Sequence, residues 1–146
     1  LREGIDVGAG GRWRRARQGT LHTSAVIERL GAQMAAAANP AKAAGMQAYM
    51  KSTMPYHGVN LPAVRSISRK AFDRSAMSCA EWRATILELW RSARYREERY
   101  AALFLLGLKR RRACLTPKQM PMLEELIVTG AWWAATRVTT RLGSAA

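Results

Sequence analysis

The stretch SCAEWRATILELWRS, residues 78–92, decides the fold class of this chain. It opens with a capping box, in which the Ser78 hydroxyl can accept a hydrogen bond from the backbone N–H of Glu81 while the Glu81 carboxylate reaches back to Ser78. Apolar side chains then recur at helical spacing, and those expected to be buried are Trp82, Ile86, Leu89 and Trp90. The stretch therefore predicts an amphipathic helix that ends at about Ser92.

Similar start signals recur along the rest of the chain. Asn39-Pro40 places a capping side chain before a proline that the first helical turn tolerates, and Thr116-Pro117-Lys118-Gln119 is interpreted as a second capping box. Further helices are expected over about residues 24–38, from residue 40 to a turn at 53–58, from residue 62, over 94–112, from residue 117, and over 131–142. In the helix that starts at residue 117, the side chains expected to be buried are Met122, Leu123, Leu126 and Ile127. No segment alternates with period two, so the predicted class is all-α.

The restarts at Ser78 and Thr116 lie 38 positions apart, close to the period of about 40 residues found in two-helix repeats. Helices with short connections pack as antiparallel neighbours, either in a bundle or in a solenoid of helical hairpins. Two restarts alone leave both architectures open.

The composition restricts the possible partners. The 146 residues carry 24 Lys and Arg against 10 Asp and Glu, a net charge of +14, and 49% of them are hydrophobic. This length suits a single domain, and the apolar content excludes a wholly disordered polycation. No apolar run approaches about 18 residues, so no membrane span is expected. The charge favours nucleic acid, because neutralised phosphates release counterions; a membrane surface and plain solubility are the competing explanations.

Residues 1–20 are expected to form a flexible basic arm, and residues 21–146 the folded domain. Three glycines between positions 8 and 11 interrupt any period, and four arginines surround Trp13. The arm could follow a phosphate backbone or be a solvated tail. It also lacks the apolar core of a secretion signal.

The two cysteines, Cys79 and Cys114, give no metal-ligand pattern. Only two histidines accompany them in the whole chain, so no zinc-ligand spacing results. A reducing cytoplasm is the simpler setting for such a sequence.

Catalytic constellations of the common kinds are missing from the sequence. The adjacent acids Glu97-Glu98 and Glu124-Glu125 are expected to be solvated charges. Two stretches stand out: AYMKSTMPYHGVNLPAVR, residues 48–65, and LEELIVTGAWW, residues 123–133. A purely structural explanation of the first stretch is a corner between two helices. A purely structural explanation of the second is that both tryptophans pack in the core. Alternatively, one tryptophan reaches a groove, because adjacent residues point about 100° apart on a helix.

Together these stretches resemble the DNA alkylation repair family of HEAT-like helical-repeat DNA glycosylases. The resemblance rests on residues 48–65, on ELW and REERYAAL within residues 88–103, and on residues 123–133, in that order, and it covers about Ala32 to Trp133. It implies an all-α solenoid of stacked antiparallel hairpins with a concave basic surface that binds duplex DNA. The implied reaction is hydrolytic excision of N3- or N7-alkylated purines, such as 3-methyladenine and 7-methylguanine, without a metal or an organic cofactor.

The resemblance also implies roles for individual residues. Trp133 corresponds to the tryptophan that faces the damaged nucleotide, where aromatic faces stabilise a cationic base. DNA-binding positions are Tyr49, Asn60, Arg65, Trp132, Arg96 and Arg99, with Arg65 as a phosphate clamp and a solvated helix face as the other explanation for Arg96 and Arg99. The expected protein is a cytoplasmic monomer.

The departure from the family lies directly after Trp133. The family has an aspartate at once and a catalytic aspartate three residues later, where this chain has Ala134 and Arg137. An arginine stays charged and cannot act as a base or stabilise a cationic sugar. The chain also ends at Ala146, where the family continues, so a C-terminally truncated or frame-shifted copy is expected. Excision activity is therefore expected to be weak or lost.

Two further classes remain open at this point. One is a non-catalytic DNA-binding module that is indifferent to lesions, and the other is a helical-repeat scaffold for an acidic protein. A gene fragment that folds poorly is the remaining explanation, because an open solenoid end exposes apolar surface.

Overall fold

The computed structural model describes residues 7–73 and 76–130. Their order is α1 (Val7–Ala36), α2 (Pro40–Tyr49), α3 (Leu61–Asp73), α4 (Cys79–Ser92), α5 (Arg96–Leu106), the 3₁₀ helices η1 (Lys109–Cys114) and η2 (Pro117–Gln119), and α6 (Met120–Gly130). No strand occurs in the part of the chain that the structure describes. The predicted all-α class is confirmed.

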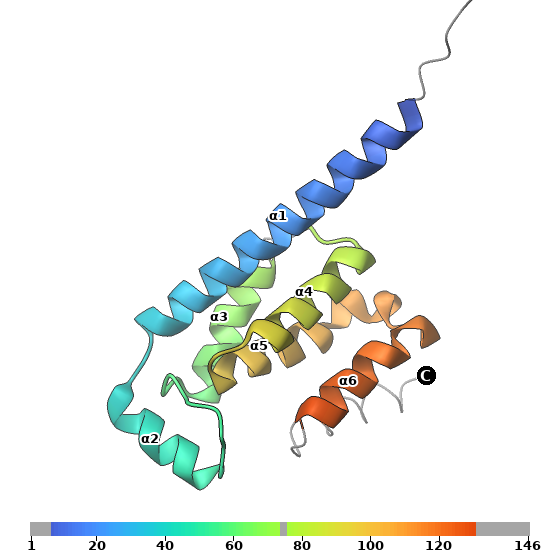
Figure 1. Ribbon diagram of the computed structural model, residues 1–146. Coiled ribbons are helices and arrows are strands. Elements are labelled where there is room, and N and C mark those ends of the chain that lie inside the picture. The colour runs from blue at the N-terminus through green and yellow to red at the C-terminus, as the bar shows by residue number, and fades with distance from the viewer. Residues whose placement is uncertain (1–6, 74–75, 131–146) are drawn as a thin grey trace, which may run out of the picture.

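The helices pack as antiparallel pairs, α1 with α3 and α4 with α5 (Figure 1). The three residues 93–95 connect α4 to α5, and these two helices form the most extensive contact in the structure. α3 packs on α5, and the long α1 runs across α3, α4 and α5. α6 packs beside α4, while α2 buries none of its residues. The arrangement is an all-α helical-repeat fold, as expected.

The core lies where α1, α3, α4 and α5 meet. Its largest fully buried side chains include Trp82, Trp90, Phe72, Leu30 and Met34. The indole N–H of Trp82 donates to the Leu105 carbonyl at 3.0 Å, so burying this ring leaves no polar group unsatisfied. All four α4 side chains expected in the core are buried.

Two of the three predicted helix caps are present. The Asn39 side chain accepts from the backbone N–H of Lys42, and the capping box of Ser78 and Glu81 is complete in both directions. The box predicted at Thr116 is wrong, because its hydroxyl makes no capping hydrogen bond. The Gln119 N–H instead donates to the Thr116 backbone carbonyl at 2.9 Å, so the chain makes a 3₁₀ turn before α6 begins.

Two helices differ in length from the sequence prediction. α5 ends at Leu106 and not near residue 112, because the backbone of Leu108 is extended (φ −63°, ψ 119°) and a 3₁₀ helix follows. α1 begins at Val7, so most of the segment expected to be a flexible arm is helical. A glycine costs a helix only about 1 kcal/mol relative to alanine, and the good helix formers around the glycines, together with the packed later turns of α1, favour continuation.

Cys79 and Cys114 form a disulfide bond, with Cα atoms 5.2 Å apart. The spacing of the two cysteines did not predict this pairing, and the reducing setting expected for them is at odds with this bond. The disulfide links the first residue of α4 to the last residue of η1. It therefore fixes the segment between α5 and η2 against the start of α4.

The prediction for α6 is partly wrong. Met122 and Leu126 are buried, but Ile127 is 41% exposed and Val128 is 69% exposed. Among the described elements α6 packs chiefly on α4 and η2, so only one narrow stripe of the helix is covered. The helix expected over 131–142 lies outside the described residues.

Candidate nucleic-acid interface

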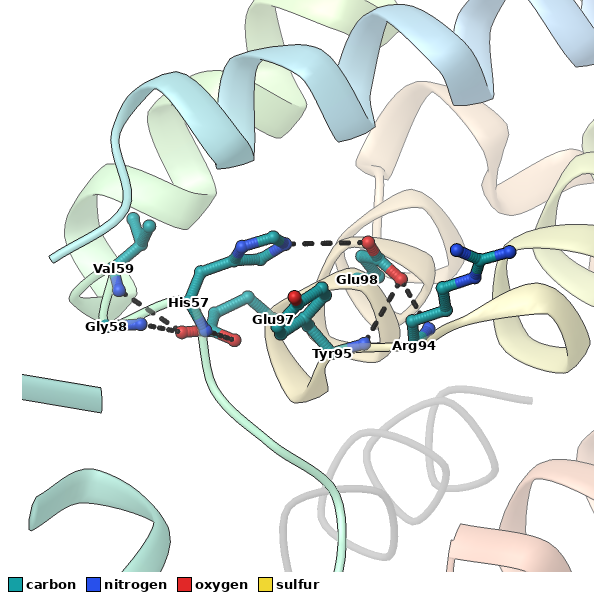
Figure 2. Close-up of polar contacts among 7 residues, drawn as sticks. All are labelled: His57, Gly58, Val59, Arg94, Tyr95, Glu97 and Glu98. Atoms are coloured by element: carbon teal, nitrogen blue, oxygen red, sulfur yellow. Dashed lines mark hydrogen bonds and ion pairs between the residues drawn. The ribbon is translucent and has the colours of Figure 1, made fainter. Parts of the chain in front are cut away.

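The corner between α2 and α3 is held by a buried glutamate. Glu97 is 0% exposed, and its carboxylate accepts three backbone N–H groups, from His57 at 3.0 Å, Gly58 at 2.9 Å and Val59 at 3.1 Å (Figure 2). A buried carboxylate needs such donors, because desolvation would otherwise make it costly. The expectation that Glu97 is a solvated charge is wrong.

Gly58 is required by this geometry. Its φ is +86°, in the region that favours glycine. A Cβ at this position would collide with the carbonyl oxygen of Asn39. The neighbouring Asn39 N–H donates to the His57 carbonyl at 2.8 Å, so the corner lies directly against the start of α2.

Glu98, next to Glu97, acts on the other side of the corner. Its Oε2 accepts from the backbone N–H groups of Arg94 and Tyr95, at 2.7 and 3.3 Å, which closes the start of α5 (Figure 2). Its Oε1 lies 3.5 Å from Nε2 of His57, and the His57 ring stacks on Tyr95 with centroids 3.7 Å apart. Both glutamates therefore tie the corner to α5.

Arg96 also belongs to the support of the corner. It is 8% exposed, its guanidinium donates to the Ser52 hydroxyl at 3.0 Å, and its backbone N–H donates to the Pro55 carbonyl. The Tyr56 and Tyr100 hydroxyls lie 3.3 Å apart nearby, and burial followed by this hydrogen bond raises the pKa of Tyr56. The Arg96 side chain is therefore not exposed for a DNA contact, and it does not belong to a solvated helix face.

Arg99 sits between α4 and the end of α6. Its guanidinium lies 4.7 Å from the Trp90 ring centre and donates to the Thr129 carbonyl at 3.4 Å. The Trp90 indole N–H donates to the Thr129 hydroxyl at 2.7 Å. Burial, with a smaller contribution from Arg96, lowers the pKa of Arg99. Trp90 and Arg99 together fix the C-terminal turn of α6, from which the Trp132-Trp133 segment continues.

The three remaining predicted contacts on the described residues are exposed. Tyr49 ends α2 with 86% of its surface exposed. The Asn60 side-chain oxygen accepts from the Ala63 N–H at 2.9 Å and so caps α3, which leaves its amide group as a donor toward solvent. The exposed Arg65 guanidinium lies 5.2 Å from the Phe104 ring centre. The corner thus carries Asn60 and Arg65 at one end and Tyr49 at the other.

Trp132, Trp133 and Arg137 lie outside the described residues, so the structure does not position them. Over residues 7–73 and 76–130, no three His, Cys, Asp or Glu side chains gather in a way that could hold a metal ion. In the same ranges, no helix combines the length and apolar character needed to cross a bilayer.

The residues that organise the corner could not be identified from the sequence. Glu97 resembles any helix-surface acid in its local context, because its three partners lie 38 to 40 positions away. The only local signal was the pair of prolines framing Gly58, which indicated a corner without indicating what holds it.

The fold and site define an all-α helical-repeat protein whose rigid corner presents polar and basic side chains. The family model described as DNA alkylation repair enzyme matches residues 30–140, and the chain belongs to this family. The match extends past Trp133, where the sequence resemblance was expected to stop, and includes Arg137. A comparison with curated proteins finds no match.

Proposed function

We propose that this protein binds duplex DNA carrying N3- or N7-alkylated purines. The family match over residues 30–140 carries the proposal, and the net charge of +14 supports it. Binding uses the corner: Arg65 contacts a phosphate, the Asn60 amide donates to the backbone, and Tyr49 lies against the DNA. The protein acts as a monomer without a metal or an organic cofactor.

The rigidity of the corner favours this assignment. Phosphate contacts set the register of a protein on DNA, and they do so best when the contacting side chains are fixed before binding. Asn60 directly follows the three N–H groups that bind Glu97, and Arg65 is held over Phe104. Within residues 7–73 and 76–130, neither side chain is paired with an acidic residue.

Excision by this chain is weak or absent because of Arg137. The family reaction develops positive charge on the sugar, which a carboxylate stabilises and a guanidinium opposes. Removing charge complementarity of this kind at a transition state typically costs about 100-fold or more in rate. A non-catalytic, lesion-binding role is therefore favoured over full glycosylase activity.

Two measurements test these statements separately. Arg65→Gln is expected to weaken duplex affinity and to reduce the salt slope by about 1, as for one lost phosphate contact. Arg83→Gln on the exposed face of α4 is the matched control and should leave the slope unchanged. Equal slopes of log affinity against log salt for both variants and wild type would show that Arg65 does not contact a phosphate. Absence of duplex binding by wild type would overturn the proposed function.

For catalysis, release of 7-methylguanine from alkylated DNA is followed over time. Arg137→Asp is expected to release more base than wild type, while Arg141→Asp changes charge equally and should not. Clear release by wild type that is lost in Trp133→Ala would show that Arg137 is compatible with excision.

A further inference from the structure

A row of basic side chains begins with Arg65 at the corner and continues along α3 to η1. α3 and η1 together contain seven Lys or Arg and a single acid, Asp73. Arg65, Arg69 and Asp73 are spaced four residues apart, so they follow one side of α3 over about 12 Å. Arg110 of η1 pairs with Asp73 at 2.6 Å, which continues the row onto η1.

The position of η1 is fixed by three independent links. Arg110 also donates to the Phe72 carbonyl at 2.7 Å, at the end of α3. Arg111 donates to the Met77 carbonyl, just before α4. The disulfide of Cys114 holds the last residue of η1 to Cys79. These links hold the backbone of η1 against α3 and α4.

The other basic side chains of this region are not used by the fold. Arg69, Lys109 and Arg112 are exposed, and none has an acidic partner among the described residues. Like charges gathered on one surface repel one another and lower stability. Their concentration here therefore favours a polyanionic binding partner that neutralises them. We refer to Arg65, Arg69, Lys109, Arg110 and Arg112 as the α3–η1 ridge.

We propose that the α3–η1 ridge binds the phosphate backbone of the same duplex that the corner contacts. The inference rests on the proposed function and extends it, because it places the protein's DNA footprint along the whole of α3. This helix of 13 residues is about 20 Å long, and a duplex advances about 3.4 Å per base pair, so α3 laid along the duplex spans about six base pairs.

The ridge contributes affinity without lesion recognition. Its side chains are Lys and Arg on a helix surface, which suit phosphates, and contacts to phosphates carry no base information. Undamaged and alkylated duplexes therefore lose the same factor of affinity when the ridge is neutralised. Each phosphate contact contributes about 0.9 to the slope of log affinity against log salt.

The test compares two triple variants with the same charge change, using a fluorescent 20-base-pair duplex as the probe. Arg69→Gln/Lys109→Gln/Arg112→Gln is expected to weaken binding about tenfold or more and to lower the salt slope by about 2 to 3. The control Arg29→Gln/Arg83→Gln/Lys118→Gln alters exposed residues outside the ridge and should shift affinity less than about threefold. Thermal unfolding of both variants verifies that they fold.

Each outcome separates the two proposals. If wild type binds the duplex and the two triple variants bind equally, the ridge assignment is wrong while the proposed function stands. If wild type does not bind, the proposed function fails first. If polyglutamate displaces the duplex as effectively as unlabelled duplex does, the ridge serves an acidic protein and the DNA assignment is overturned.

Discussion

The Glu97 carboxylate and the backbone N–H of Gly58 are joined by a 2.9 Å hydrogen bond across 39 positions of sequence. Two neighbouring N–H groups bind the same carboxylate, so one buried side chain satisfies three consecutive donors of a loop that makes no regular structure. Buried backbone donors left without partners are costly, and this loop can therefore be both irregular and rigid. Its rigidity fixes the start of α3, where Asn60 and Arg65 lie.

Replacing Glu97 by glutamine tests this role directly. Both carboxylate oxygens accept hydrogen bonds, so an amide NH₂ at either position would face a donor. We expect Glu97→Gln to lower the free energy of unfolding by about 2–4 kcal/mol, as measured by urea denaturation. The exposed Glu124→Gln should change it by less than about 0.5 kcal/mol. A loss below that level for Glu97→Gln would show that the carboxylate is not what holds the corner.

Gly58 provides a second test of the same corner, with a control of opposite sign. Gly58→Ala forces a Cβ into the Asn39 carbonyl at a positive φ, and should cost about 3 kcal/mol or more. At Gly45 in α2 a Cβ meets nothing within 4 Å, so Gly45→Ala should stabilise by about 0.5–1 kcal/mol. Chemical denaturation of both variants gives the comparison, and equal effects would contradict the geometry.

Local signals in the sequence predicted the parts of the fold that depend on neighbouring residues. The capping box at Ser78 and the cap at Asn39 each involve groups three positions apart, and both are present. The failure at Thr116 has the same local origin, because a competing backbone hydrogen bond to Gln119 was available. Where two local arrangements use the same N–H group, sequence spacing does not choose between them.

Contacts between distant segments could not be predicted from these local signals. Glu97 was expected in solvent and is fully buried, whereas Ile127 was expected in the core and is exposed. Burial depends on which helix faces are covered by distant segments, and the local sequence pattern does not indicate this. Of the predicted DNA contacts, Tyr49, Asn60 and Arg65 are exposed as binding requires, while Arg96 supports the corner from inside.

The Cys79–Cys114 disulfide should contribute measurably to stability. The bond closes a loop between residues 35 positions apart, and loop-closure entropy for this length corresponds to about 3–4 kcal/mol. Dithiothreitol is therefore expected to lower the urea midpoint of wild type and to leave Cys79→Ser unchanged. Titration of two free thiols in the native protein without reductant would show that the bond does not form, in keeping with a reducing cytoplasm.

The capping box at the start of α4 should make stability depend on pH. Hydrogen bonds from the backbone and side chain of Ser78 hold the pKa of the Glu81 carboxyl below its usual value of 4.5. Because the folded pKa is lower than the unfolded one, the unfolded chain binds the proton more readily. The contribution of Glu81 is therefore complete above about pH 5 and is lost as the pH falls through the folded pKa.

Glu81→Gln isolates this contribution, because glutamine can also form the box but does not titrate. The free energy of unfolding is measured for both proteins by urea denaturation between about pH 3 and pH 7. Wild type should lose stability relative to Glu81→Gln only at the acidic end, since all other carboxylates are shared and cancel. A difference that stays constant across the whole range would mean that the Glu81 carboxyl has the same proton affinity in the folded and unfolded chain.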